Sequence, residues 1–279
     1  MALKTIVVHL TNDRDHATRM EVAKSLAEQH GAFLTALYIT RSSDRLQHIA
    51  GRSVSPVFLE EAYESAKRHA AEVEQEFADY CEHRGIAHEW IVADDEYLDA
   101  MARHAHAADL LIVTRPTDQH LEDKLRTRLA EEVIVNSGLP VMVLPPGFEN
   151  KGFENNWTPK RVLIAWKANK GAVRAVRDSL AILHRAETVL IGTVKPSAED
   201  ASSTLEIMQY LERQGIQFAS IDLTEQHSVG ETLLAMAAAH DCDLLIAGAY
   251  GRSRIREILF GGVTRHLLRH AAIPLLLSH

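Results

Sequence analysis

The chain has 279 residues, of which 46% are apolar and 24% charged, and its formal net charge is −8. This length suits two domains, and the composition is that of a folded globular protein rather than a disordered or fibrous one. The negative charge disfavours nucleic acid and anionic membranes as partners, and no apolar run approaches the roughly 18 residues of a membrane span. The start turns acidic before a signal-peptide core could form, and two distant cysteines suit reduced thiols. We therefore expect a cytoplasmic protein whose partner is a small molecule or another protein.

The first half alternates short Val/Ile/Leu-rich runs with longer stretches of 3.6-residue apolar periodicity, which is the order of an α/β domain. We expect its strands near residues 4–10, 33–39, 86–92, 109–114 and 140–145. Because these runs are apolar along their whole length, they predict a mainly parallel sheet buried between helices. An insertion over residues 41–56 precedes a long helical pattern that reaches Arg84, and we expect it to form a surface loop.

A linker rich in Pro, Gly and Asn, Pro145 to Pro159, leads into the second half, where the same alternation returns. Strands are expected near residues 160–166, 188–194, 216–222, 243–248 and 273–278. Helices are expected near residues 171–185, 201–214, 230–240 and 257–270.

The two halves are copies of one unit. The segment from Lys4 aligns without a gap on the segment from Lys160, and "ADLLIVT" near the end of the first half matches "CDLLIAG" in the second. Both copies also keep the same spacing between this strand and the next, so a duplication is the economical explanation. We expect domains over residues 1–146 and 159–279.

A glycine-rich segment, "GAYGRSRIREILFGGVTRHLL", follows the fourth strand of the second copy. Ligands of parallel α/β sheets collect at the carboxyl ends of strands, where bare amides at helix starts attract anions. The segment therefore predicts a phosphate site, although the glycines could instead serve only the turn and close helix packing. Its glycines and nearby arginines are Gly248, Gly251, Arg252, Arg254, Gly261 and Gly262.

The spacing fits neither the phosphate loop G-x-x-x-x-G-K-[ST] nor the dinucleotide fingerprint G-x-G-x-x-G. It is Gly-x-x-Gly, nine residues, Gly and a small residue, and it is similar to the nucleotide-binding signature of the universal stress protein family. The run that continues to "IPLLL" also resembles that family's C-terminal segment. The whole chain resembles two tandem universal stress domains, strongly in the second copy and in the first chiefly through the repeat.

The resemblance implies an α/β fold with two tandem five-stranded parallel open sheets flanked by helices, Rossmann-like and of the adenine nucleotide alpha hydrolase type. Many members of the family bind ATP and some do not, so ATP with Mg²⁺ is the cofactor it suggests. Carried over by position, the phosphates would lie near Gly248, Gly251, Arg252, Gly261, Gly262 and Val263, with Ser253 and Thr264 as nearby hydroxyls. The base would lie near Val194 and Ala247.

Two positions depart from the family's pattern. Lys167 stands where binders usually carry an Asp after the first strand, and an ammonium can neither receive ribose hydroxyls nor support a divalent cation. It could instead meet the phosphates, in a different pose. Gly262 replaces a Ser or Thr but keeps its backbone N–H. Trp166, beside the expected site, could line the pocket or fill it.

The first copy lacks the signature. The equivalent positions are Thr114, Thr117, Thr127 and Arg128, so we expect no nucleotide site of this design there and assign that half a structural or interface role.

Four residues around the end of the first strand could hold a divalent ion, but their spacing is not that of a known metal site, so no metal is predicted. These residues are His9, Asp13, Asp15 and His16.

Three functions remain open. The first is a non-enzymatic stress-response or signalling protein with a single adenine-nucleotide site in the second domain. The second is a slow ATPase, which would require a general base and a metal-binding carboxylate near the phosphates. The third is a scaffold that binds an unknown protein partner, in which the paired domains mimic a homodimer within one chain.

Overall fold

The computed structural model describes residues 2–11, 13–40, 55–115, 130–148, 157–194, 198–224, 228–249 and 262–279. Contacts divide the described residues into two compact units. The N-terminal unit is Ala2–Val113, and the C-terminal unit combines Thr114–Phe148 with Trp157–His279. The domain limits expected from the repeat stay a prediction, because grouping by contacts is a different criterion from sequence duplication.

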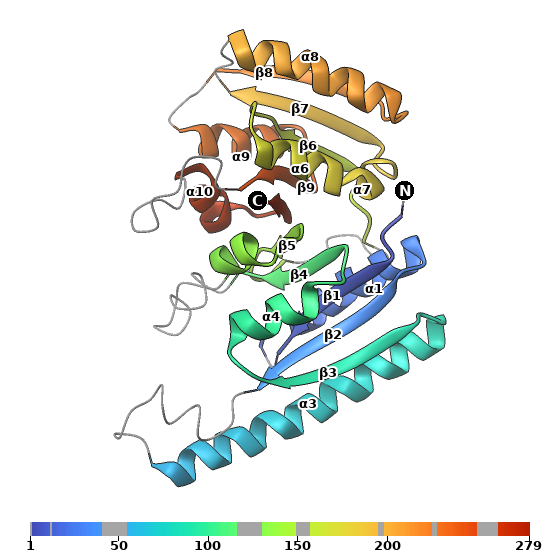
Figure 1. The fold of residues 1–279 in the computed structure, drawn as a ribbon, viewed down its shortest axis with the longest axis vertical. Helices are drawn as coiled ribbons and strands as arrows, with labels where there is room; N and C mark the ends of the chain where they lie inside the picture. The colour runs from blue at the N-terminus through green and yellow to red at the C-terminus, as the bar shows by residue number, and fades with distance from the viewer. Residues whose placement is uncertain are drawn as a thin grey trace. The chain divides into compact units, whose positions relative to one another are not determined.

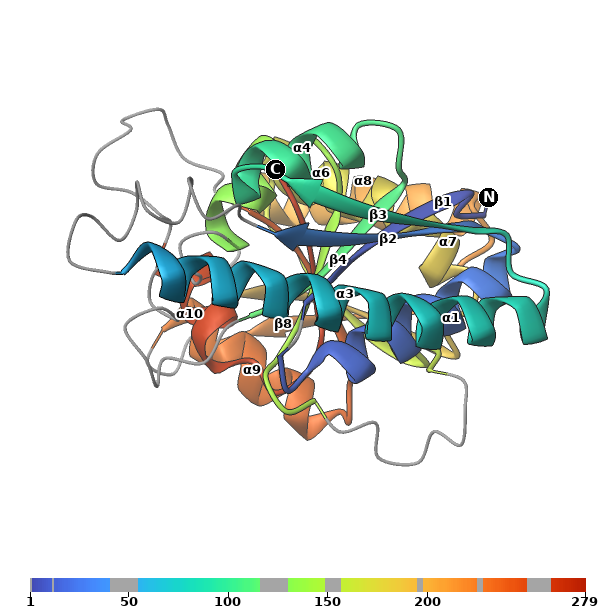
Figure 2. The same ribbon diagram turned by 90° about the horizontal axis from the view of Figure 1, so that it is seen from below.

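The N-terminal unit is a parallel sheet with helices on both faces. Strand β1 lies between β2 and β4, and β3 forms the edge beyond β2. Helices α1 and α3 cover one face and α4 covers the other (Figures 1 and 2). The elements are β1 Thr5–Leu10, α1 His16–His30, β2 Phe33–Thr40, α3 Pro56–Arg84, β3 His88–Asp94, α4 Tyr97–Ala105 and β4 Leu110–Thr114, whose last residue is grouped with the other unit.

The C-terminal unit has the strand order β5-β10-β9-β6-β7-β8. Its strands are parallel except for the antiparallel pair of β5 and β10. Helices α9 and α10 contact each other, and α6 packs on β9 and β10 (Figure 1). The elements are β5 Val141–Leu144, β6 Arg161–Ala165, α6 Lys170–Asp178, α7 Leu180–Leu183, β7 Thr188–Val194, α8 Ala198–Arg213, β8 Phe218–Leu223, α9 Val229–Ala239, β9 Leu244–Gly248, α10 Gly262–His270 and β10 Leu275–Ser278, with a further helical stretch over 130–136.

The predicted α/β order is confirmed, and all ten strands lie within about two residues of their predicted bounds. One helix differs, because the stretch predicted over 171–185 is divided at Ser179. Its hydroxyl donates to the carbonyl of Val176 at 3.0 Å, which competes with the regular helical bonding pattern. Nearly all of the insertion at 41–56 and the first part of the helix at 257–270 lie outside the described residues. None of the helices that the structure describes is long and apolar enough to cross a membrane.

The repeat is visible in one recurring contact at the amino end of the first strand of each copy. Asp109 accepts hydrogen bonds from the amides of Lys4 and Thr5, at 2.6 and 3.0 Å. Asp243 accepts from Lys160 and Arg161, at 2.8 and 3.0 Å. Equivalent aspartates thus hold equivalent strand starts, which supports the duplication inferred from the sequence.

A buried lysine lies between α1 and α3. The side chain of Lys24 is 2% exposed, and its Nζ lies 3.5 Å from Glu21 and 3.6 Å from the ring centroid of Tyr80. Burial lowers the pKa of Lys24, and the attraction of Glu21 opposes this only in part. Burial of the charged form of Lys24 therefore lowers the free energy of unfolding.

This lysine predicts a pH dependence of stability. Because its pKa is lower in the folded chain than in the unfolded chain, the contribution of Lys24 to the free energy of unfolding should rise as the pH increases from neutral toward 10.5, its unperturbed pKa. Burial raises the pKa of the neighbouring Cys81 and Tyr80, whose contributions have the opposite sign, so the effect of Lys24 is measured as a difference between two chains. Lys24→Met should be as stable as the parental chain at pH 7, or up to roughly 2 kcal/mol more stable, and this difference should move in favour of the parental chain as the pH rises. Urea unfolding at pH 7 and pH 10 gives the free energies of unfolding of the parental chain and of Lys24→Met. If the two chains change in parallel with pH, the prediction is wrong.

Candidate functional site

The carboxyl ends of three neighbouring parallel strands bring together several residues predicted to bind a ligand. β6 pairs with β9, with Ala165 opposite Ala247, and with β7, with Ala165 opposite Gly192. Lys167 therefore lies just beyond the end of β6. Gly248 is the last residue of β9, and Val194 is the last residue of β7. The structure confirms that these residues share one edge of the sheet.

Gly248 is required by packing, whether or not a ligand binds. Its φ is not in the left-handed region. A Cβ added at this position would lie 2.5 Å from the carbonyl carbon of Gly171 and closer still to the amide nitrogen of Ala172, in the first turn of α6. The bare Cα thus allows β9 to approach the start of α6, and the contact is between backbone atoms, which cannot move aside as a side chain can.

The start of α6 is capped by the protein itself. The side chain of Asn169 accepts a hydrogen bond from the amide of Ala172 at 2.9 Å, which is an N-cap interaction. The following strand end is also engaged, because the amide of Ala249 donates to the carbonyl of Ser278 at 2.8 Å. The amides of Ala172 and Ala249 therefore already have acceptors within the protein.

The start of α10 is more open. Gly262 is its first described residue and is exposed, and a Cβ added there would meet no atom of the residues that the structure describes within 4 Å. Val263 is also exposed, whereas Thr264 is buried. Because first-turn amides have no acceptor within their own helix, this end can receive an anion. Five residues of the predicted phosphate segment lie outside the described residues, namely Gly251, Arg252, Ser253, Arg254 and Gly261.

The two residues that follow β6 have different environments. Lys167 is exposed. Trp166 is 5% exposed, and its indole Nε1 donates to the hydroxyl of Ser203 on α8 at 3.2 Å. Within the described part of the chain, the nearby hydroxyl of Thr193 on β7 is buried without a hydrogen-bond partner. Trp166 thus fills space between the end of β6 and α8, and a cationic side chain reaches solvent beside it.

In the N-terminal unit, the equivalent strand end is occupied by an internal polar network. The Nε of Arg19 donates to the carbonyl of His9 at 2.7 Å, and its Nη2 contacts both carboxylate oxygens of Asp13 at 3.0 Å. The ring of His16 hydrogen-bonds to the carbonyl of Asp13, and the ring of His9 meets Tyr97 edge-on. No group of three or more potential ligands that could hold a metal ion occurs among the described residues. Of the first-copy positions equivalent to the glycines, only Thr114 is described.

The comparisons with known proteins agree with this architecture. Residues 159–279 match the model of the Universal stress protein family. A universal stress protein from Archaeoglobus fulgidus DSM 4304 aligns over 98% of this chain and 95% of its own, at a TM-score of 0.75 and 15% identity. A functionally unknown protein from Pseudomonas aeruginosa PAO1 aligns over 99% and 92%, at a TM-score of 0.65 and 14% identity. A universal stress protein in complex with cAMP aligns over 44% of this chain and 98% of its own, at a TM-score of 0.38 and 21% identity. No curated protein matches the sequence.

The fold is therefore α/β, of the adenine nucleotide alpha hydrolase-like class, and is repeated along the chain. Segment 159–279 is similar to the universal stress protein family, whose model it matches. The full-length alignments give the whole chain the fold of tandem structures of this type.

Proposed function

We propose that this chain is a non-enzymatic stress-response or signalling protein that binds an adenine nucleotide, with ATP as the expected ligand, in segment 159–279. The observation that carries the proposal is the open start of α10, where Gly262 and Val263 are exposed in the part of the sequence that carries the family's glycine pattern. The phosphates would lie at this helix start.

Lys167 supports a phosphate contact that does not depend on a metal ion. It is exposed at the end of β6, the strand next to β9. A lysine can pair with phosphate oxygens but cannot coordinate Mg²⁺. Since phosphoryl transfer relies on a metal ion and a group that orients the nucleophile, we assign the site to binding rather than to hydrolysis.

A scaffold without nucleotide is the second candidate, and Trp166 favours it. The buried indole, held by Ser203, occupies space at the strand end where a nucleotide base or sugar would otherwise enter. In that case, the glycine segment would serve packing, as it does at Gly248, and the chain would act through a protein partner.

Titration calorimetry of the full chain with ATP, with and without Mg²⁺, separates these functions. We expect saturable heat in both conditions, and we expect Lys167→Ala to weaken binding about tenfold, because one charge-assisted contact of roughly 1.5 kcal/mol is lost. Lys160→Ala is the matched control, since this exposed lysine precedes β6 at its opposite end. Phosphate release would indicate the ATPase instead, and the absence of heat in the parental chain would favour the scaffold.

A further inference from the structure

The antiparallel pair of β5 and β10 has a register that is symmetric between the two sequence copies. Leu276 faces Met142, and the flanking pairs are Leu275 with Val143 and Leu277 with Val141. The offset of 134 residues that relates Asp109 to Asp243 also relates Met142 to Leu276. Equivalent positions therefore face each other, as they do when one strand pairs with a second copy of itself across a two-fold axis.

The strands alone do not determine which copy pairs with which. Both are buried and almost wholly apolar, VMVL in β5 and LLLS in β10. Two β10 strands from different chains could meet in the same register with Leu276 opposite Leu276. A strand edge of this kind pairs readily with a second molecule unless other groups prevent it.

An ion pair beside the strands distinguishes the two copies. Glu131, in the helical stretch 130–136, lies 3.6 Å from the Nε of Arg265 on α10. The same offset of 134 residues relates these two positions, which carry opposite charges. The side chain of Glu131 is 4% exposed and that of Arg265 is 42% exposed. Pairing of like with like would place two arginines or two glutamates together, which is unfavourable near a buried position.

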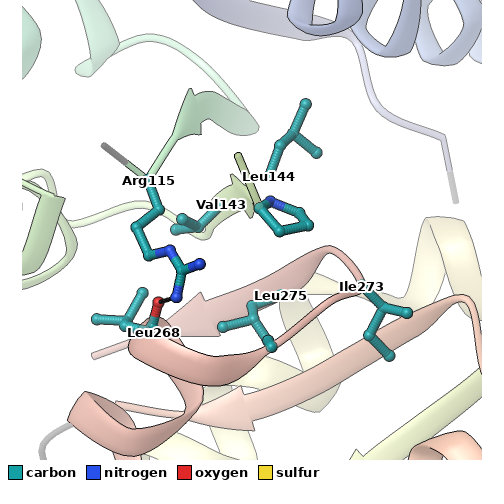
Figure 3. Close-up of a pocket in the computed structure, with 8 residues that line it drawn as sticks. Arg115, Val143, Leu144, Leu268, Ile273 and Leu275 are labelled. Carbon is teal, nitrogen blue, oxygen red and sulfur yellow. Dashed lines mark hydrogen bonds between the residues drawn. The ribbon is translucent and has the colours of Figure 1, made fainter. Parts of the chain in front are cut away.

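A second contact is also made by only one of the two sequence copies. The guanidinium of Arg115, which follows β4, donates to the carbonyl of Leu268 in the last turn of α10 (Figure 3). The side chain crosses a small pocket whose other lining residues are apolar. The residue equivalent to Arg115 in the second copy is Ala249, which has no side-chain donor. Two β10 edges brought together would thus lack this contact on both sides.

We propose that Glu131 and Arg115 act as specificity determinants for the β10 edge. They make the surface formed by α10 and β10 accept Arg115, the helical stretch 130–136 and β5 of the same chain and reject a second copy of itself. The kind of partner that fits this surface is a strand and helix with an acidic side chain opposite Arg265 and a long cationic side chain opposite the end of α10. The chain therefore does not use this edge to form a homodimer.

A charge exchange in the full chain tests the proposal. The variants are Glu131→Arg, Arg265→Glu and the double variant that carries both, and the readout is hydrogen exchange of the β5 and β10 amides, with chain mass in solution measured in parallel. Each single variant should lose at least about tenfold in protection, because like charges meet, and the double variant should recover to within about threefold of the parental chain. Arg269→Glu, an exposed charge change on the same helix, should leave protection unchanged.

The double variant keeps the test decisive if a single variant fails to fold, since folding of the double variant alone would itself demonstrate the coupling. Arg115→Met, which retains the apolar stem, should independently lower the protection of β10. The proposal is overturned if the single variants keep parental protection, if the double variant is as unprotected as the single variants, or if the parental chain is a dimer joined through β10.

Discussion

Gly248→Ala is expected to destabilise the C-terminal unit by at least about 3 kcal/mol, the upper part of the range for overpacking substitutions. The new Cβ would lie 2.5 Å from the carbonyl carbon of Gly171 and closer to the amide nitrogen of Ala172. Because both obstacles are backbone atoms, relief requires β9 and α6 to move apart. That movement would also disturb the hydrogen bond of Asn169 that caps α6.

Gly262→Ala is the matched control for this prediction. Gly262 belongs to the same glycine segment, but a Cβ there meets no atom within 4 Å among the described parts of the chain, and the residue is helical without a positive φ. Its free energy of unfolding should stay within roughly 0.5–1 kcal/mol of the parental value and should not fall, because alanine is the better helix former. Urea unfolding of both variants provides the comparison; equal losses would mean that Gly248 has no special packing role.

The sequence predicted the strands well because each is a short apolar run bounded by turn residues, and this pattern is local. It also predicted that Lys167 and Gly248 share an edge, since the carboxyl ends of parallel strands lie together. The pairing of β5 with β10 was beyond such reasoning. Apolar runs reveal burial but not which strand is the neighbour, so the sequence duplication alone did not show that residues 114–148 group with the second copy.

Contacts between distant segments account for what the sequence missed at the site. Ser203 lies 37 residues from Trp166, and nothing in its local pattern marks it as an indole partner. The cap at Asn169 could have been found, because Asn is a preferred N-cap residue directly before a helical pattern. The packing role of Gly248 could not, since it depends on the approach of β9 to α6 rather than on a turn.

Arg19→Ala is expected to cost about 2–4 kcal/mol in the N-terminal unit. The guanidinium is 1% exposed and bonds both the carbonyl of His9 and the carboxylate of Asp13. Its removal leaves a cavity and separates Asp13 from its cation. Since Asp13 is 30% exposed, water can solvate the carboxylate, which places the loss below that of a fully buried pair.

The second copy supplies the matched control for Arg19. At the equivalent positions, 156 residues later, it has Ala175 in place of Arg19 and Asn169 in place of Asp13, and Asn169 caps α6 there. The double variant Arg19→Ala with Asp13→Asn should therefore recover at least about 1 kcal/mol relative to the single variant, because no unpaired carboxylate remains and the asparagine oxygen can still accept a hydrogen bond from the amide of Asp15, as Asp13 does. Urea unfolding of the parental chain, both single variants and the double variant gives the coupling energy. Strict additivity would contradict this prediction, because it would show that Arg19 and Asp13 stabilise the fold independently.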